Sequence, residues 1–114
     1  MPYIAINTSV KLSGAQKEKI KTELGRLITV IPTKTEAGTL VDFSDSRTIY
    51  KGGENVPGAF IDVRLFHKAD FESRKKFTEE TFAMLSRELG LDRKNMYLSI
   101  LEFENWGSDG TYRS

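Results

Sequence analysis

The sequence predicts an α+β protein in which a duplicated β-α-β unit forms a four-stranded mixed sheet with both helices on one face. Two observations lead to this prediction. A shift of half the 114-residue chain superposes apolar residues on apolar residues, and each half reads as strand, helix, strand. The length fits a single domain, residues 1–114, composed of pseudo-repeats 1–57 and 58–114.

The repeat is visible at positions 57 residues apart, half of 114. Ile4 and Ile6 of the first half superpose on Ile61 and Val63 of the second. The further matched pairs are Ser13 and Asp70, Ile20 and Phe77, Leu27 and Met84, Ile28 and Leu85, Val41 and Leu98, and Phe43 and Ile100. Because the matches run through every element without a gap, we expect the two halves to share one fold.

The first half is predicted to form a strand over residues 3–8, a helix over 16–30 and a second strand over 39–43. The strands alternate, and the helix carries apolar residues at helical spacing. Ser13, followed three residues later by Gln16, has the spacing of a capping box at the start of the helix.

The second half repeats this order with a strand over 59–66, a helix over 71–89 and a strand over 96–102. Asp70 is suited to cap the start of this helix, and Gly90 is suited to end it. The residues suited to begin a helix thus occupy equivalent positions in the two halves.

Two right-handed crossover connections place both helices on the same side of the sheet and leave the other face open. The alternation over 59–66 and the run over 97–103 put substantial apolar area on both faces. We therefore expect a closed homo-oligomer that covers the open face. The segments 52–58 and 106–112, rich in Gly, Asn, Ser and Asp, are predicted to be loops at the edges of such contacts.

Composition and charge argue against several classes of partner. The 17 Lys and Arg residues nearly balance the 16 Asp and Glu residues and are interspersed, so we expect no nucleic-acid partner. With no cysteine and a single histidine, His67, we expect no disulfide, metal or other cofactor. No apolar run approaches the roughly twenty residues that cross a bilayer, and the start does not read as a signal peptide. We expect no membrane partner and a cytoplasmic location.

Pro2 is the candidate catalytic base. A small residue at position two allows removal of Met1, which converts the Pro2 nitrogen from an amide into a secondary amine. An α-amino group titrates near pH 8, and burial lowers that pKa because it disfavours the charged form. Such an amine is a competent base at neutral pH, and the strand that follows at once places it at an end of the sheet. Taken alone, a proline at position two is better explained by N-terminal processing or by a rigid strand entrance than by catalysis.

Several short features together resemble the macrophage migration inhibitory factor (MIF) family of the tautomerase superfamily over essentially the full length. They are the opening Met1–Thr8, Lys34 after the first helix, the turn over 50–53, the Met-Tyr-Leu run over 96–98 and the Thr-Tyr pair over 111–112. The resemblance implies a homotrimer in which three sheets wrap into a barrel, with active sites at the subunit interfaces.

The resemblance also implies the residues of the site. Pro2 corresponds to the base, Lys34 to the cation that meets a substrate carboxylate, and Phe66 to a residue whose backbone N–H contacts the substrate. Tyr97 and Ser99 correspond to pocket residues supplied by the neighbouring subunit. Trp106 and Tyr112 complete the implied substrate-binding set.

The chain departs from the family pattern at several positions. Ser99 stands where the family usually has asparagine, and Trp106 lies two positions before the usual tryptophan, whose place is taken by Ser108. Gly58 and Ile61 replace the Cys-x-x-Cys of some relatives, so we expect no thiol oxidoreductase activity. These differences affect the shape of the pocket and therefore the choice of substrate.

The leading functional prediction is an isomerase, a keto–enol tautomerase that acts on an aryl 2-keto acid such as phenylpyruvate. One alternative is another chemistry of the superfamily, such as dopachrome tautomerisation with decarboxylation, or dehalogenation of a haloacid, for which Arg64 and Glu102 are not placed convincingly. The other is a MIF-like cytokine or interaction protein with incidental activity and an unidentified receptor. Since the family leaves cells without signal peptides, an extracellular location fits as well.

Overall fold

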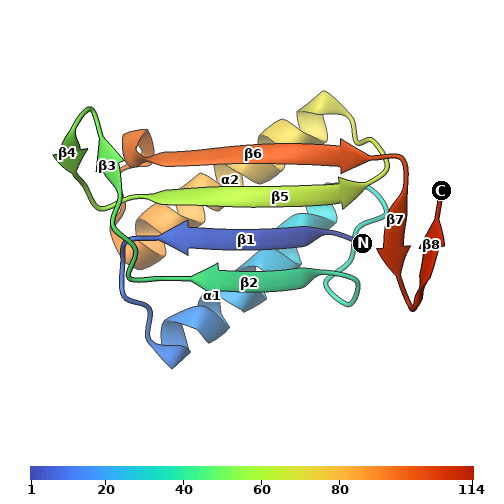
Figure 1. The fold of residues 1–114 in the computed structure, drawn as a ribbon, viewed down its shortest axis with the longest axis horizontal. Coiled ribbons are helices and arrows are strands. Elements are labelled where there is room, and N and C mark those ends of the chain that lie inside the picture. Colours follow the sequence, from blue (N-terminus) through green and yellow to red (C-terminus); the bar gives the residue numbers. More distant parts are fainter.

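The computed structural model describes residues 1–114 and contains a four-stranded mixed sheet with two helices behind one face (Figure 1). The strands are β1 (Tyr3–Thr8), β2 (Leu40–Ser44), β5 (Ala59–Phe66) and β6 (Met96–Phe103), in the order β2-β1-β5-β6. The helices are α1 (Gly14–Leu27) and α2 (Phe71–Leu89), and two 3-10 turns, η1 (Ile28–Val30) and η2 (Arg93–Asn95), precede β2 and β6. The predicted α+β class and the placement of both helices on one face are confirmed.

The strand pairing follows the half-chain shift. β1 and β2 are parallel, with Ile4 opposite Val41, and β5 and β6 are parallel, with Ile61 opposite Leu98. Each member of the second pair lies 57 positions after its counterpart in the first. The central pair, β1 with β5, is antiparallel. Moving both residues of a β1–β5 pair by 57 positions, each onto the other strand, gives another pair in the same register. The sheet therefore has an approximate twofold relation between its halves.

The predicted helix ends are formed by local hydrogen bonds. The Ser13 hydroxyl accepts from the N–H of Gln16 at 3.1 Å, and the Gln16 side chain accepts from the N–H of Ser13 at 2.9 Å, which completes the capping box. Asp70 accepts from the N–H of Ser73 at 2.9 Å. Gly90 ends α2 with a φ of 69°, a conformation that glycine adopts without steric cost.

The prediction of a helix over 16–30, with Ser13 as its cap, was wrong at its C-terminal end. The helix begins at Gly14, and its α-helical part ends at Leu27, after which the chain continues as η1. Ile31 then has extended backbone angles, φ −86° and ψ 120°. A proline follows at position 32, and its ring disfavours helical angles in the preceding residue.

The two segments predicted to be loops instead contain hairpins. One pairs β3 (Tyr50–Lys51) with β4 (Glu54–Asn55), and the other pairs β7 (Trp106–Ser108) with β8 (Thr111–Arg113). Two consecutive residues with positive φ close each hairpin: Gly52 and Gly53, at 59° and 82°, and Asp109 and Gly110, at 53° and 76°. This is the backbone of a two-residue turn that matches the twist of paired strands.

The core lies between the sheet and the helix layer. Its sheet side is formed by alternate residues of the central strands, and its helix side by residues at helical spacing. The completely buried members include Ile4, Ile6, Ile61, Val63, Leu65, Ile20, Leu24, Phe77 and Leu85. Neither helix has the length and apolar character to cross a membrane.

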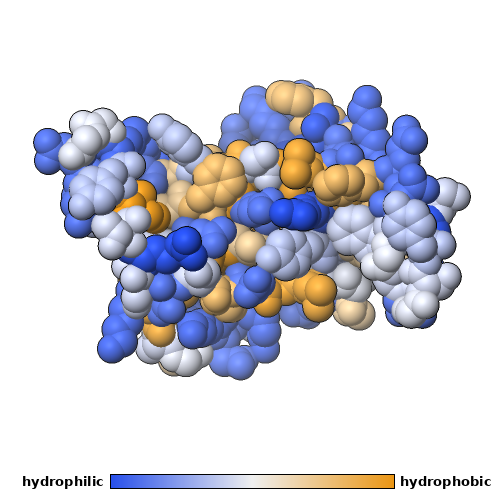
Figure 2. Space-filling view, in the orientation of Figure 1, coloured by the Kyte–Doolittle hydropathy of each residue, from blue (hydrophilic) through white to orange (hydrophobic).

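The opposite face of the sheet is uncovered in the single chain (Figure 2). Five of the eight large apolar side chains that are exposed lie on this open face: Leu40, Phe60, Tyr97, Leu101 and Phe103. A polar band crosses it, formed by the Arg64–Asp62 ion pair at 3.5 Å and the hydrogen bond from Tyr3 to Asp42 at 2.8 Å. The open face thus carries the predicted apolar area together with charges that were not predicted.

Candidate active site

β1 begins at the end of the sheet where the β7–β8 hairpin lies (Figure 1). A hollow of about 430 Å³ lies there, lined by residues of both segments. Its lining includes Met1, Pro2, Trp106 and Ser108 together with the segment that leads into β2. Pro2 is buried, and its carbonyl accepts the N–H of Leu40 at 3.0 Å. The start of β1 is therefore held in line with β2, which fixes the position of the proline ring.

Lys34 reaches this end of the sheet from the segment between η1 and β2. Its Nζ donates a hydrogen bond of 2.7 Å to the carbonyl of Phe66, the last residue of β5. It also lies close enough to the terminal amine of Met1 for the two groups to influence each other's pKa. The structure thus brings together the N-terminus, the lysine and Phe66, as the resemblance implied.

These contacts change the proton affinity of both amines. Burial, and after it the positive charge of Lys34, lowers the pKa of the terminal amine below its ordinary value of 8.0. Burial also lowers the pKa of the Lys34 ammonium, and the hydrogen bond with the terminal amine partly opposes that decrease. Of the two neighbours, the terminal amine has the lower ordinary pKa, 8.0 against 10.5 for the lysine. A base and a cation are therefore adjacent at this site.

The backbone of Phe66 faces the same space. In a strand, the N–H and the carbonyl of one residue point to the same side, and the Phe66 carbonyl points to Lys34. The next amide, that of His67, points the other way and donates to Phe103 at 2.8 Å. No carbonyl of Met1 or Pro2 accepts from the Phe66 N–H. This N–H is therefore a donor directed at the start of β1.

Aromatic rings form one wall of the site. Trp106 stacks on Phe66, with centroids 6.0 Å apart and planes inclined by 19°, and lies 6.1 Å from the ring of Phe103. Ser108 lines the hollow too, and its hydroxyl donates to the Met1 sulfur at 2.8 Å. Despite its displaced position in the sequence, Trp106 lies at the site, and the Met1 side chain occupies part of the space beside it.

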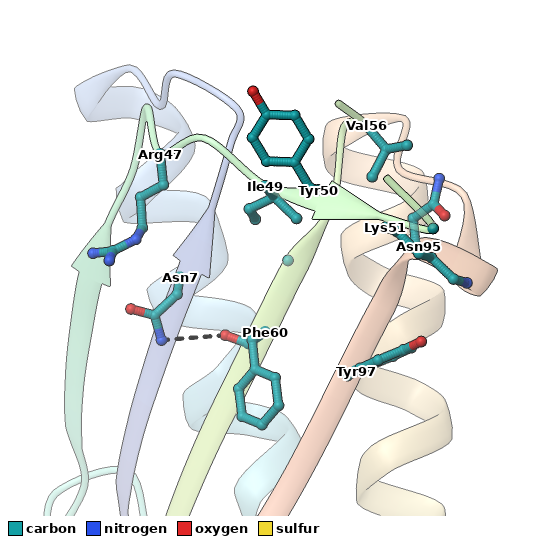
Figure 3. A pocket seen from close by; sticks show the side chains of 11 residues that line it. Asn7, Arg47, Ile49, Tyr50, Lys51, Val56, Phe60, Asn95 and Tyr97 are labelled. Atoms are coloured by element: carbon teal, nitrogen blue, oxygen red, sulfur yellow. Dashed lines mark hydrogen bonds between the residues drawn. The ribbon is translucent and has the colours of Figure 1, made fainter. Parts of the chain in front are cut away.

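Three of the implied residues do not reach Pro2 within one chain. Tyr97 lines a separate hollow of about 450 Å³, between the β3–β4 hairpin and the starts of β5 and β6 (Figure 3). Ser99 follows it on the open face, in the interior of β6. Tyr112, on β8, lines a hollow of about 400 Å³ that adjoins the Pro2 site. The structure therefore groups Pro2 with Lys34, Phe66 and Trp106, and separates the two residues expected from a neighbouring subunit.

Two nearby residues were not assigned to the site from sequence. Tyr3 lines the Pro2 hollow, and Arg64 lies opposite Tyr3 in the pairing of β1 with β5. Their signal was the strand period: Tyr3 follows Pro2 directly, and Arg64 precedes Phe66 by two residues and so shares its face. His67 is exposed, and the centroid of its ring lies 3.8 Å from that of Phe66. No group of three or more histidine or acidic side chains is arranged to hold a metal ion.

No protein-family model matches the chain, and no curated protein matches its sequence. Solved structures match its fold. MIF2 from Leishmania major has a TM-score of 0.92 at 22% identity, covering 99% of this chain and 97% of that one. The MIF-like protein of Entamoeba histolytica has a TM-score of 0.86 at 21% identity, covering 98% of both chains. Pt0534, solved after inactivation by 2-oxo-3-pentynoate, has a TM-score of 0.83 at 18% identity, covering 95% of this chain and 92% of that one.

The duplicated β-α-β architecture and these matches define the class of fold, which this chain shares with the MIF proteins and with Pt0534. More narrowly, it is the fold of macrophage migration inhibitory factor, which confirms the resemblance seen in the sequence. At these identities the likeness is one of fold.

Proposed function

We propose that the protein is a tautomerase of the MIF family that interconverts the keto and enol forms of an aryl 2-keto acid such as phenylpyruvate. The proposal rests on one observation above all. The N-terminal amine lies partly buried against Lys34, where burial and charge lower its pKa. Removal of Met1 would place the free amine on Pro2, which is buried and lines the hollow at the same end of the sheet.

In the proposed reaction the substrate carboxylate binds the Lys34 ammonium, and the carbon next to the ketone faces the Pro2 nitrogen. Pro2 takes a proton from that carbon, the C–H electrons form the carbon–carbon double bond, and the carbonyl oxygen becomes an enolate. The Lys34 ammonium and the Phe66 N–H stabilise the negative charge as it develops on oxygen. The protonated amine then returns the proton to oxygen, so that one residue serves as base and acid.

The comparison with Pt0534 supports the substrate class. The compound that inactivated that protein, 2-oxo-3-pentynoate, is a 2-oxo acid. A protein of the same fold therefore reacts with a molecule that carries the carboxylate and ketone which the proposal assigns to Lys34 and Pro2.

We further propose that the protein is a homotrimer. The open face carries five exposed apolar side chains, and Tyr97 and Ser99 lie away from Pro2 within one chain. A neighbouring copy that covers this face would bury the apolar area and bring those two residues to the site. Sedimentation at micromolar concentration should give a trimer, and a stable monomer would contradict the assembly.

The site favours tautomerisation over hydrolytic dehalogenation, which requires a free carboxylate to activate water. Glu102 is not free for this role, since its two oxygens accept the N–H of Ala69 and pair with Arg74 at 3.3 Å. A cytokine-like role uses surfaces rather than this chemistry, and the experiment below separates it from the proposed reaction.

The decisive experiment compares three forms of the protein in a phenylpyruvate tautomerase assay, with the state of Met1 verified by intact mass. The processed form should be active. A form that retains Met1 should lose activity by a factor of about 100 or more, because an amide nitrogen is not a base. Processed Pro2→Gly keeps a terminal amine and should retain a small residual rate. Equal rates for the processed and the Met1-retaining forms would reject Pro2 as the base and favour an interaction role.

A further inference from the structure

The Pro2 site continues into a second hollow on the open face. This Arg64 hollow has a volume of about 400 Å³ and is lined by Tyr3, Arg64, Phe103, Asn105, Trp106, Gly107 and Tyr112. Three of these residues, Tyr3, Trp106 and Gly107, also line the Pro2 hollow. A molecule bound at Pro2 can therefore extend along these shared walls into the Arg64 hollow.

Arg64 is the one cation of this second hollow, and its donors are largely unused. Its guanidinium lies over the Tyr3 ring, 5.9 Å from the centroid, and is about half exposed. Its ion-pair partner is Asp62, at 3.5 Å, and it donates no hydrogen bond within the chain. A guanidinium has five N–H donors in a planar fork that matches a carboxylate. The unused donors are therefore suited to an anionic group of a ligand.

Arg64 and Lys34 both lie near the end of β5, so one ligand could contact both cations. Lys34 is held by the Phe66 carbonyl, and Phe66 and Arg64 are alternate residues on one face of β5. Alternate residues of a strand lie roughly 7 Å apart, a distance that a short carbon chain spans. Arg64 also pairs with Tyr3, the residue that follows Pro2. The start of β1 thus lies near two cations: Lys34 beside the terminal amine, and Arg64 beside Tyr3.

We propose that Arg64 binds a second carboxylate, so that a 2-keto acid with a second, distal carboxylate binds more tightly than the corresponding monocarboxylate, whereas a monoacid such as phenylpyruvate reacts without this contact. The first carboxylate binds Lys34, the ketone faces Pro2, and the far carboxylate binds Arg64 between the aromatic walls. This inference rests on the proposed function for the orientation of the ketone. The second contact concerns binding alone and can be measured without turnover.

The acidic groups of the open face determine how strong this contact is. Asp62 competes with a ligand for Arg64, whereas Asp42 is engaged by the Tyr3 hydroxyl at 2.8 Å. Removal of the Asp62 charge by Asp62→Asn should therefore strengthen diacid binding, and removal of the Arg64 charge by Arg64→Met should weaken it. The two variants act in opposite directions on one contact, which separates a change in charge from a loss of fold.

The test uses a matched pair of six-carbon ligands, 2-oxoadipate with two carboxylates and 2-oxohexanoate with one. Their dissociation constants are measured by calorimetry on the processed protein. The unsubstituted protein should bind the diacid roughly tenfold more tightly than the monoacid, the size of one charge-assisted contact at a half-exposed site. Arg64→Met should abolish that ratio, and Asp62→Asn should raise it. Lys76→Met removes a positive charge from an exposed position on α2 and should leave the ratio unchanged.

Two results would overturn the inference: equal binding of the two acids by the unsubstituted protein, or an unchanged ratio in Arg64→Met. Sedimentation of the same variants identifies the competing role. If Arg64 pairs with a neighbouring copy instead of a ligand, Arg64→Met will weaken the oligomer and leave the ratio unchanged. The tautomerase assay tests the proposed reaction independently of ligand binding. Failure of that assay with a normal binding ratio would reject the proposed reaction and leave the second carboxylate contact in place.

Discussion

The two ends of the sheet are related by the half-chain shift, yet only one of them carries reactive groups. At the start of β1 lie Pro2 and Lys34, with the lysine held by the end of β5. The equivalent positions at the start of β5, 57 residues later, are Ala59 and Leu91, and Leu91 is 1% exposed in the core. The two halves thus have the same backbone arrangement, and a few side chains determine which end of the sheet carries reactive groups.

The backbone differs between the two ends as well. At the start of β5, the Gly58 carbonyl accepts the N–H of Ser9 at 3.2 Å. At the start of β1 the equivalent hydrogen bond would run from the N–H of Phe66 to the carbonyl of Met1. That bond is not formed. A donor satisfied by the chain at one end is therefore available for a substrate at the other.

The largest effect should come from exchanging the residues at the equivalent positions 34 and 91. Leu91→Lys places an ammonium in the core and should lower the free energy of unfolding by several kcal/mol, on the order of 3–5 kcal/mol. Lys34→Leu should leave the fold stable while removing the carboxylate contact. Urea unfolding measures both variants. Similar losses of stability at the two positions would contradict the distinction between a core position and a site position.

Gly58 should tolerate little change, because a Cβ at this position would lie 2.6 Å from the carbonyl oxygen of Asn95. Gly58→Ala should therefore destabilise the protein by about 1–3 kcal/mol through overpacking. Gly14→Ala is the matched control, since nothing lies within 4 Å of a Cβ there. The midpoints of urea unfolding for the two variants test this, and a loss no larger for Gly58→Ala than for the control would refute it.

The pH dependence of kcat/KM reports the amine directly. Only the uncharged amine takes a proton, so activity should rise with pH through its pKa. Burial and then the Lys34 charge lower the pKa of the Met1 amine at this place. We expect the same two causes to act on the Pro2 amine once Met1 is removed, so the rise should lie below the pKa of a free proline amine. Lys34→Ala removes one of these causes and should move the rise to higher pH, whereas Lys76→Met should not move it. A rise at or above the pKa of a free proline amine in the unsubstituted protein would argue against a base in these surroundings.

Most of the fold follows from periodicity and from the repeat. The two-residue strands of the β3–β4 hairpin are too short to show alternation, so only the Gly52-Gly53 turn indicated them. The Asp109-Gly110 pair is an equally strong signal of a hairpin turn. The prediction of a loop over 106–112 relied on composition and did not use this signal. Local patterns predict strands and helices, and short hairpins depend on turn geometry that composition does not describe.

The site is less accessible to sequence reasoning. Pro2, Lys34 and Phe66 were assigned through the resemblance, and the structure groups them at one end of the sheet. The role of Arg64 was not predicted, because it depends on the register that places Arg64 opposite Tyr3 in strands far apart along the chain. A shift of this pairing by two residues would keep every side chain on its own face and give Arg64 a different neighbour, so the alternation within each strand does not specify the register.

The smallest expected effect concerns a pair of equivalent helix positions. Leu24 of α1 and Thr81 of α2 are both fully buried, and the Thr81 hydroxyl has no hydrogen-bond partner. Thr81→Val keeps the shape and removes the unpaired hydroxyl, which should stabilise the protein by about 1 kcal/mol. Thermal unfolding measures the change, and Thr81→Ser, which keeps the hydroxyl and loses a methyl group, should be destabilised. A lower melting temperature for Thr81→Val would show that the hydroxyl has a partner.

The antiparallel pairing of β1 with β5 also bears on how the chain folds. It joins Ile6 to Ile61 across the two halves, while each parallel pair forms within a half. Contacts between distant residues bear a larger loop-closure entropy, so we expect each half to gain structure early and the halves to dock late. Ile6→Val and Ile61→Val should then accelerate unfolding and leave the folding rate nearly unchanged. A folding rate that falls in proportion to the loss of stability would instead place this pairing in the folding nucleus.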